Sequence, residues 1–114
     1  MTKTPMQMVE EFRVTMGQEK DKGLSCDLIF EEYDEWYMST QFTKLEELKE
    51  LADLVYVIYG YANAQGWDLD EALRRVHDNN MERCIWPDGT IKRNEMGKIL
   101  KNPDAPKVDL GDLV

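Results

Sequence analysis

Two pairs of acidic residues, placed on either side of a short polar turn, most constrain how this chain can fold. Glu32 with Glu35 and Glu50 with Asp53 are each three residues apart, a spacing that puts both side chains on one face of a helix. If the chain reverses at residues 39–42, two antiparallel helices place Glu35 level with Glu50 and Glu32 level with Asp53. We therefore predict a helical hairpin in which four carboxylates converge on one small volume.

This convergence predicts a metal site. Carboxylates held so close repel one another unless a cation neutralises them, and oxygen ligands suit Mg²⁺, with Mn²⁺ as a substitute. The alternative is a solvated acidic helix face, which is the usual origin of a single ExxE pattern. Two pairs mirrored about one turn are uncommon by chance, so we expect Glu32, Glu35, Glu50 and Asp53 to bind the metal.

The remaining pattern predicts an all-α helical hairpin bundle of about four helices. Apolar residues recur at helical spacing, and capping signals occur at Thr4, Thr43 and Asp68. We expect helices over about residues 5–16, from about 25 or 27 to 38, from the cap at 43 to 65, and from the cap at 68 to about 81, with a loop at 18–23. From about residue 86 to residue 114, turn residues and prolines predict an irregular tail.

Length and charge limit the class of protein. A chain of 114 residues suggests one domain over residues 1–114. Residues 1–70 carry 6 Lys and Arg against 15 Asp and Glu, and such an acidic surface argues against binding nucleic acid through its phosphates. Residues 71–107 carry 8 basic against 6 acidic residues, a surplus that could serve one small anionic ligand.

The sequence also indicates a compartment and narrows the chemistry. No apolar run reaches the ~18 residues of a membrane span and no signal peptide is indicated, so we expect no membrane association and a cytoplasmic location. Cys26 and Cys84 lack the spacing of a zinc site. His77 is the only histidine and no GxSxG motif occurs, which leaves metal-assisted attack by water as the chemistry that the residues favour.

Residues 54–61 are apolar nearly all round the expected helix. Such a helix must be covered on several sides, and a chain this small has few elements to cover it. We therefore expect a homo-oligomer, either a homodimer or a homotetramer. The alternative is a central helix in a monomeric bundle whose tyrosine hydroxyls reach solvent.

The acidic residues also carry a family resemblance. The segments Glu31-Glu32-Tyr33-Asp34-Glu35 and Glu50-Leu51-Ala52-Asp53 resemble the EExxE and ExxD signature of the MazG-like all-α nucleoside triphosphate pyrophosphohydrolases. That group includes phosphoribosyl-ATP pyrophosphohydrolase and dimeric dUTPases. The resemblance extends from about Val9 to Leu110, and its acidic motif is the specific part.

The resemblance implies a single domain that hydrolyses a nucleoside or deoxynucleoside triphosphate to the monophosphate and pyrophosphate with Mg²⁺. It implies that Glu32 or Glu35 acts as general base and favours a purine substrate such as dGTP or GTP. A family segment in which Asn is followed three residues later by Lys corresponds to Asn80 and Arg83, and a GKxxK element corresponds to residues 97–101. The implied substrate-binding residues are Asn80, Arg83, Lys98 and Lys101.

Two other functions stay open from the sequence. The resemblance permits phosphoribosyl-ATP pyrophosphohydrolase activity, and the same acidic hairpin could be a non-catalytic module that binds a nucleotide or a partner protein. Phe12 and Trp36 are candidates for stacking on a base, although aromatic residues at helical spacing are more often core.

Overall fold

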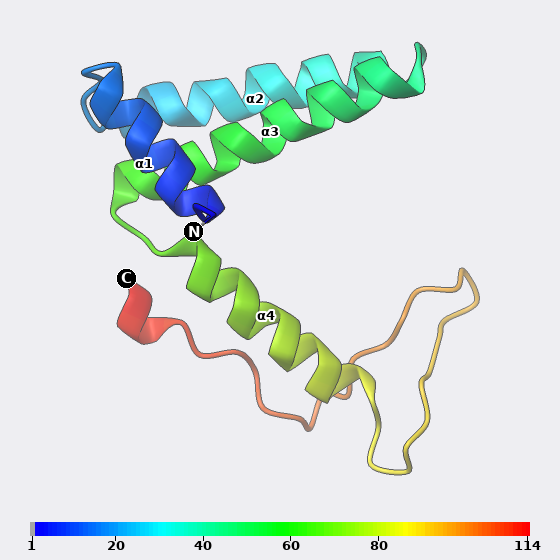
Figure 1. Ribbon diagram of the computed structural model, residues 1–114. Helices are drawn as coiled ribbons and strands as arrows, with labels where there is room; N and C mark the ends of the chain where they lie inside the picture. The colour runs from blue at the N-terminus through cyan, green and yellow to red at the C-terminus, as the bar shows by residue number, and fades with distance from the viewer. Residues whose placement is uncertain (1) are drawn as a thin grey trace. The chain divides into compact units, whose positions relative to one another are not determined.

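The computed structural model describes residues 2–114 and confirms the all-α prediction (Figure 1). No β-strand occurs within residues 2–114, where the only ladder-type pairing is an isolated bridge between Arg93 and Ile99. The helices are α1 (Pro5–Thr15), α2 (Lys22–Ser39), α3 (Lys44–Gln65), α4 (Leu69–Cys84) and the short 3₁₀ helix η1 (Gly111–Leu113).

The chain divides into two compact units. One ends at Asp70 and contains α1, α2 and α3, and the other runs from Glu71 to Val114. All four predicted metal ligands belong to the first unit. The single domain expected over residues 1–114 stays a prediction.

The first helix starts where the sequence predicts. The Thr4 hydroxyl accepts a hydrogen bond from the Gln7 N–H at 3.3 Å, and the Thr4 N–H donates to the Gln7 side chain at 2.9 Å. This reciprocal capping box satisfies two N–H groups that a helix start leaves open. Gly17 follows the helix with φ of 64°, a left-handed conformation that costs glycine little.

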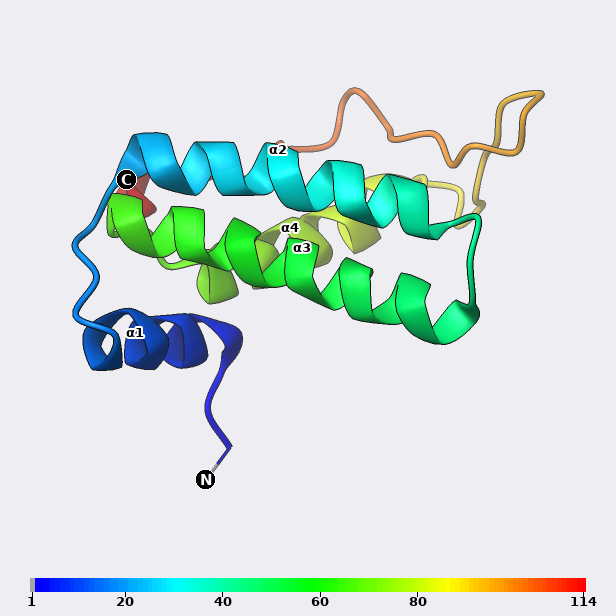
Figure 2. The same cartoon turned by 90° about the horizontal axis from the view of Figure 1, so that it is seen from above.

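The helices α2 and α3 form the predicted antiparallel hairpin and lie side by side along their length (Figure 2). The Thr43 hydroxyl caps α3 by accepting the Glu46 N–H at 3.2 Å. Gly66 ends α3 in a left-handed conformation with φ of 76°. Because α2 ends at Ser39 and the Thr43 cap starts α3 at Lys44, the turn between the helices is confined to residues 40–43. This short turn sets the register of the two acid pairs.

The predicted start of α2 at residue 25 or 27 is wrong. The helix begins at Lys22 because the Asp21 carboxylate accepts the Leu24 N–H at 3.0 Å and caps an earlier turn. The polar loop is correspondingly shorter than the predicted 18–23.

The predicted end of α4 near residue 81 is also wrong, because the helix continues to Cys84. Arg83 in the last turn interacts favourably with the negative end of the helix dipole. The tail beyond it is irregular, as predicted, and is fastened to α4. Arg75 forms a two-pronged ion pair with Asp112 at 2.6 and 3.0 Å, and Asn79 donates to the Pro106 carbonyl at 2.8 Å.

The apolar core is small. Among the described residues, only three apolar side chains are buried: Val9, Tyr59 and Ala62. The apolar second half of α3 leaves Val55 45% and Tyr56 40% exposed. No helix in residues 2–114 is long and apolar enough to cross a membrane.

Candidate metal centre

Three carboxylates from the two helices of the hairpin converge on one point. Glu32 and Glu35 lie one turn apart on α2, and Glu50 approaches from α3. One carboxylate oxygen from each lies within 4.8 Å of the other two. The spacing of three residues and the short turn together place them there, so the predicted convergence is found in the structure for these three residues.

The environment of Glu32 shows how strongly the cluster disfavours negative charge. Its pKa is raised from 4.5 to about 7, chiefly by desolvation, then by a hydrogen bond with Glu35 and by the neighbouring charges of Glu35, Asp53 and Glu50. Burial and nearby like charges both favour the protonated form of a carboxyl group. The folded hairpin therefore disfavours the ionised form of the Glu32 carboxyl group.

Two oxygens of the cluster are buried without a hydrogen-bond partner in the described part of the chain. They are Oε2 of Glu32 and Oε2 of Glu50. A buried acceptor left unpaired costs about 1–3 kcal/mol, and a solvated acidic helix face would not incur that cost. The donor set is made entirely of carboxylate oxygens, which fits a hard divalent cation.

Asp53 lies near the cluster but is engaged differently from the other three acids. The Lys49 ammonium lies 2.6 Å from Oδ2 of Asp53 and 3.7 Å from Oε1 of Glu50. These acids raise the pKa of Lys49, first through the hydrogen bond to Asp53. Sequence reasoning missed Lys49, although its i,i+4 spacing to Asp53 is a signal for such a pair.

An open pocket adjoins the cluster at the turn end of the hairpin. Its cavity volume is about 450 Å³. Glu35 and Glu50 line it together with Asp34, Met38, Ser39, Phe42 and Glu46. The carboxylates of Glu35 and Glu50 are thus reachable by a ligand from this side.

The four predicted substrate-binding residues belong to the second unit. Asn80 and Arg83 lie in the last turns of α4, and the Arg83 Nε atom is buried without a hydrogen-bond partner within residues 2–114. Lys98 lies in a turn whose backbone is paired with Asn94 at 2.9 Å, and both Lys98 and Lys101 are exposed. Their contact with a substrate stays a prediction.

Acidification is expected to stabilise the metal-free protein. Because folding raises the pKa of Glu32 from 4.5 to about 7, the folded state binds a proton that the unfolded state releases. This contribution is fully present below about pH 4.5 and is lost as the pH rises through about 7. Hydrogen bonds from Arg74 and Arg75 lower the pKa of Glu71 to about 2. Its protonation therefore changes the folding stability only at more acidic pH.

Thermal unfolding of the chelator-treated protein at about pH 5.5 and about pH 8 checks this expectation. The Tm should be lower at the higher pH, and Glu32→Gln should reduce the difference. The exposed acid Glu31 on the same helix provides the control variant Glu31→Gln, which should keep it. A Tm that rises with pH in the unmodified protein would contradict the electrostatic account.

Comparison with known proteins agrees with the geometry. A family model described as phosphoribosyl-ATP pyrophosphohydrolase matches residues 6–80, well over half of the chain. The matched segment contains the whole hairpin, all four acids and Asn80, but it ends before Arg83, Lys98 and Lys101. No curated protein matches the chain.

Proposed function

The chain belongs to the phosphoribosyl-ATP pyrophosphohydrolase family of MazG-like all-helical nucleotide pyrophosphohydrolases, and on this premise we propose that it hydrolyses a nucleoside or deoxynucleoside triphosphate with Mg²⁺. The products are the monophosphate and pyrophosphate. The observation that carries the proposal is the convergence of Glu32, Glu35 and Glu50 within 4.8 Å, because such a cluster suits a cation that also contacts phosphate oxygens.

Glu32, Glu35, Glu50 and Asp53 would hold the ion. When bound, Mg²⁺ supplies neutralisation of the phosphate oxygens and lowers the pKa of a water molecule. Two observations support the fit of a cation to this cluster: the unpaired buried oxygens of Glu32 and Glu50 and the raised pKa of Glu32. A bound cation would give these oxygens a partner and would lower the pKa of Glu32. Mn²⁺ has the same ligand preference and serves as a substitute.

The protein's own residues position and deprotonate the attacking water. Glu35 is exposed, lines the open pocket and is hydrogen-bonded to Glu32, so either carboxylate can accept the proton as general base. The water oxygen forms a bond to phosphorus, the phosphoanhydride bond between the α- and β-phosphates breaks, and pyrophosphate leaves. Asn80, Arg83, Lys98 and Lys101 would contact the phosphates and stabilise the charge on the leaving group.

The substrate that we propose is a purine nucleotide such as dGTP or GTP. A second candidate is phosphoribosyl-ATP, which the description of the matching family model favours. Both reactions break the same kind of phosphoanhydride bond and release pyrophosphate. A non-catalytic nucleotide-binding module would bind these ligands without releasing any.

Pyrophosphate release from the eight common NTPs and dNTPs and from phosphoribosyl-ATP tests the proposal. We expect release with Mg²⁺ or Mn²⁺ and its loss when a chelator is present, with one substrate preferred over the others. Preferential release from phosphoribosyl-ATP would select the second candidate. No release from any of the nine compounds by the folded protein would overturn the hydrolytic function that we propose.

We further propose that the protein works as a homodimer or homotetramer. A groove of about 360 Å³ between α1 and α3 is lined almost entirely by apolar side chains. Leu48, Leu51 and Val55 follow one stripe of α3 in this groove and are 64%, 42% and 45% exposed. An apolar surface of this kind, beside so small a core, is typical of an interface, and a second copy of the chain is the partner that the proposal names.

A further inference from the structure

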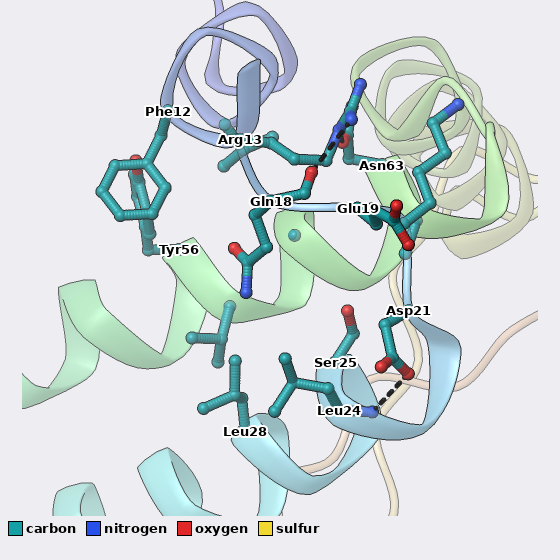
Figure 3. A pocket seen from close by; sticks show the side chains of 15 residues that line it. Phe12, Arg13, Gln18, Glu19, Asp21, Leu24, Ser25, Leu28, Tyr56 and Asn63 are labelled. Atoms are coloured by element: carbon teal, nitrogen blue, oxygen red, sulfur yellow. Dashed lines mark hydrogen bonds between the residues drawn. The ribbon is translucent and has the colours of Figure 1, made fainter. Parts of the chain in front are cut away.

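A second cavity lies in the first unit, beside the carboxylate cluster but separate from the open pocket. It has a volume of about 230 Å³ and lies between α1, residues 18–21, the start of α2 and the second half of α3 (Figure 3). Its wall is mostly apolar. The apolar lining includes Val9, Phe12, Leu24, Leu28, Tyr56 and Val57.

The cavity begins one helical turn from the predicted metal ligands on both helices of the hairpin. Leu28 precedes Glu32 by four residues on α2, and Val57 follows Asp53 by four residues on α3. At ~1.5 Å of rise per residue, the separation along each helix axis is about 6 Å. One extended ligand can therefore occupy the cavity and reach the carboxylates.

Two neutral polar side chains, those of Gln18 and Ser25, line this cavity, as do the charged side chains of Glu19 and Lys20. The Gln18 side chain extends into the cavity between Tyr56 and Leu28 (Figure 3), and the Ser25 hydroxyl lines the same space. No hydrogen bond within residues 2–114 engages the Gln18 amide or the Ser25 hydroxyl. Both groups are available to a ligand.

Two other polar residues of the wall, Arg13 and Asn63, form hydrogen bonds that hold the cavity in shape. Asn63 of α3 accepts a hydrogen bond from Arg13 Nε at 2.7 Å and donates one to the Glu10 carboxylate. Arg13 also donates to the Gln18 carbonyl at 3.2 Å. This network ties α1, α3 and the loop together, so Arg13 is a positioning residue that fixes the backbone from which the Gln18 side chain extends.

We propose that this cavity receives the nucleobase of the substrate and that Gln18 is a specificity-determining residue; the inference rests on the proposed function. Phe12 and Tyr56 meet edge to face, with ring centroids 5.8 Å apart, and give the wall aromatic surface for a planar ring. The Gln18 amide presents a donor beside an acceptor, which pairs with a base edge that carries an acceptor beside a donor. The phosphates then extend along the hairpin to Glu32, Glu35 and Glu50.

Nucleosides without phosphates test the base site independently of hydrolysis. We would add adenosine, guanosine, cytidine, uridine and their deoxy forms to ¹⁵N-labelled, metal-free protein and follow the amide shifts. At least one should shift the signals of Gln18, Ser25 and Gly60, and Leu28→Trp, which fills the cavity, should abolish the shifts. Shifts that map elsewhere, or none with any nucleoside, would overturn the inference.

Kinetics of Gln18→Leu provide the second readout. Gln18 is exposed, so the variant should fold. Loss of the hydrogen bonds between the Gln18 amide and the base should raise KM for the preferred nucleotide by about tenfold. It should also change the order in which the enzyme prefers the nucleotides. Because the base binds equally in the ground state and the transition state, kcat should change little. The control variant Gln41→Leu makes the same change at an exposed position in the hairpin turn. It should alter neither KM nor the preference among nucleotides.

The two proposals fail in distinguishable ways. Nucleoside shifts in the cavity without any pyrophosphate release would overturn the hydrolytic function and support the base site. Active enzyme whose base preference is the same in the unmodified protein and in Gln18→Leu would overturn the role of Gln18.

Discussion

Replacing Glu35 with Gln should lower kcat for pyrophosphate release by about two to four orders of magnitude, the range expected for loss of a general base. The amide keeps the shape of the side chain but neither accepts the proton of water nor carries the charge that binds a cation. Glu35 is exposed and adds to the repulsion that raises the pKa of Glu32. The variant should therefore fold normally, and its metal-free form should be at least as stable as the unmodified protein.

The matched control is Glu31→Gln, which makes the same chemical change on the same helix. Glu31 is exposed and lies outside the cluster of three carboxylates, so this variant should keep its turnover. Steady-state kinetics at saturating Mg²⁺ measure kcat for both variants, and circular dichroism verifies that they fold. Full activity of Glu35→Gln would remove Glu35 from the reaction and leave Glu32 as the candidate base.

The hairpin and its acid pairs were predictable because they depend on local rules. Residues three apart share a helix face, and the Thr43 cap and the short turn fix the register of α2 against α3. The resemblance and the family match then agree with this geometry. The functional roles assigned to the acids stay predictions.

The two errors concern helix boundaries, one set by a single capping side chain and the other by where the first helix breaker occurs. The segment of residues 18–23 is polar and contains Gly23, which favours a loop, but the Asp21 cap starts α2 at Lys22. At the end of α4, residues 82–84 have no helix breaker, and the helix continues until the chain approaches Pro87.

The cavity between α1, residues 18–21, the start of α2 and the second half of α3 could not have been predicted from sequence. Its shape depends on two hydrogen bonds of Asn63, which accepts one from Arg13 and donates one to Glu10, residues 50 and 53 positions away along the chain. No periodicity or spacing rule indicates such a contact. In contrast, the incomplete burial of α3 was foreseeable from its apolar surface. Whether this surface forms an interface between copies of the chain is open to a direct test.

Replacing Leu48 with Asp should convert the proposed oligomer into a smaller species. Leu48 lines the apolar groove and is 64% exposed, so an Asp there is solvated in the isolated chain and costs little folding stability. In an interface between two copies the same carboxylate would be buried without a partner. Such a charge costs about 3–5 kcal/mol, which weakens association by about two to four orders of magnitude.

The control for this experiment is Leu45→Asp, because Leu45 lies one turn earlier on α3, is 79% exposed and is not part of the groove. Sedimentation velocity over a range of concentrations should show Leu48→Asp dissociating at concentrations where Leu45→Asp and the unmodified protein remain associated. If all three sediment alike as oligomers, the interface lies on another face. If all three are monomers, the groove between α1 and α3 is not a self-association surface, and the homo-oligomer proposal is wrong.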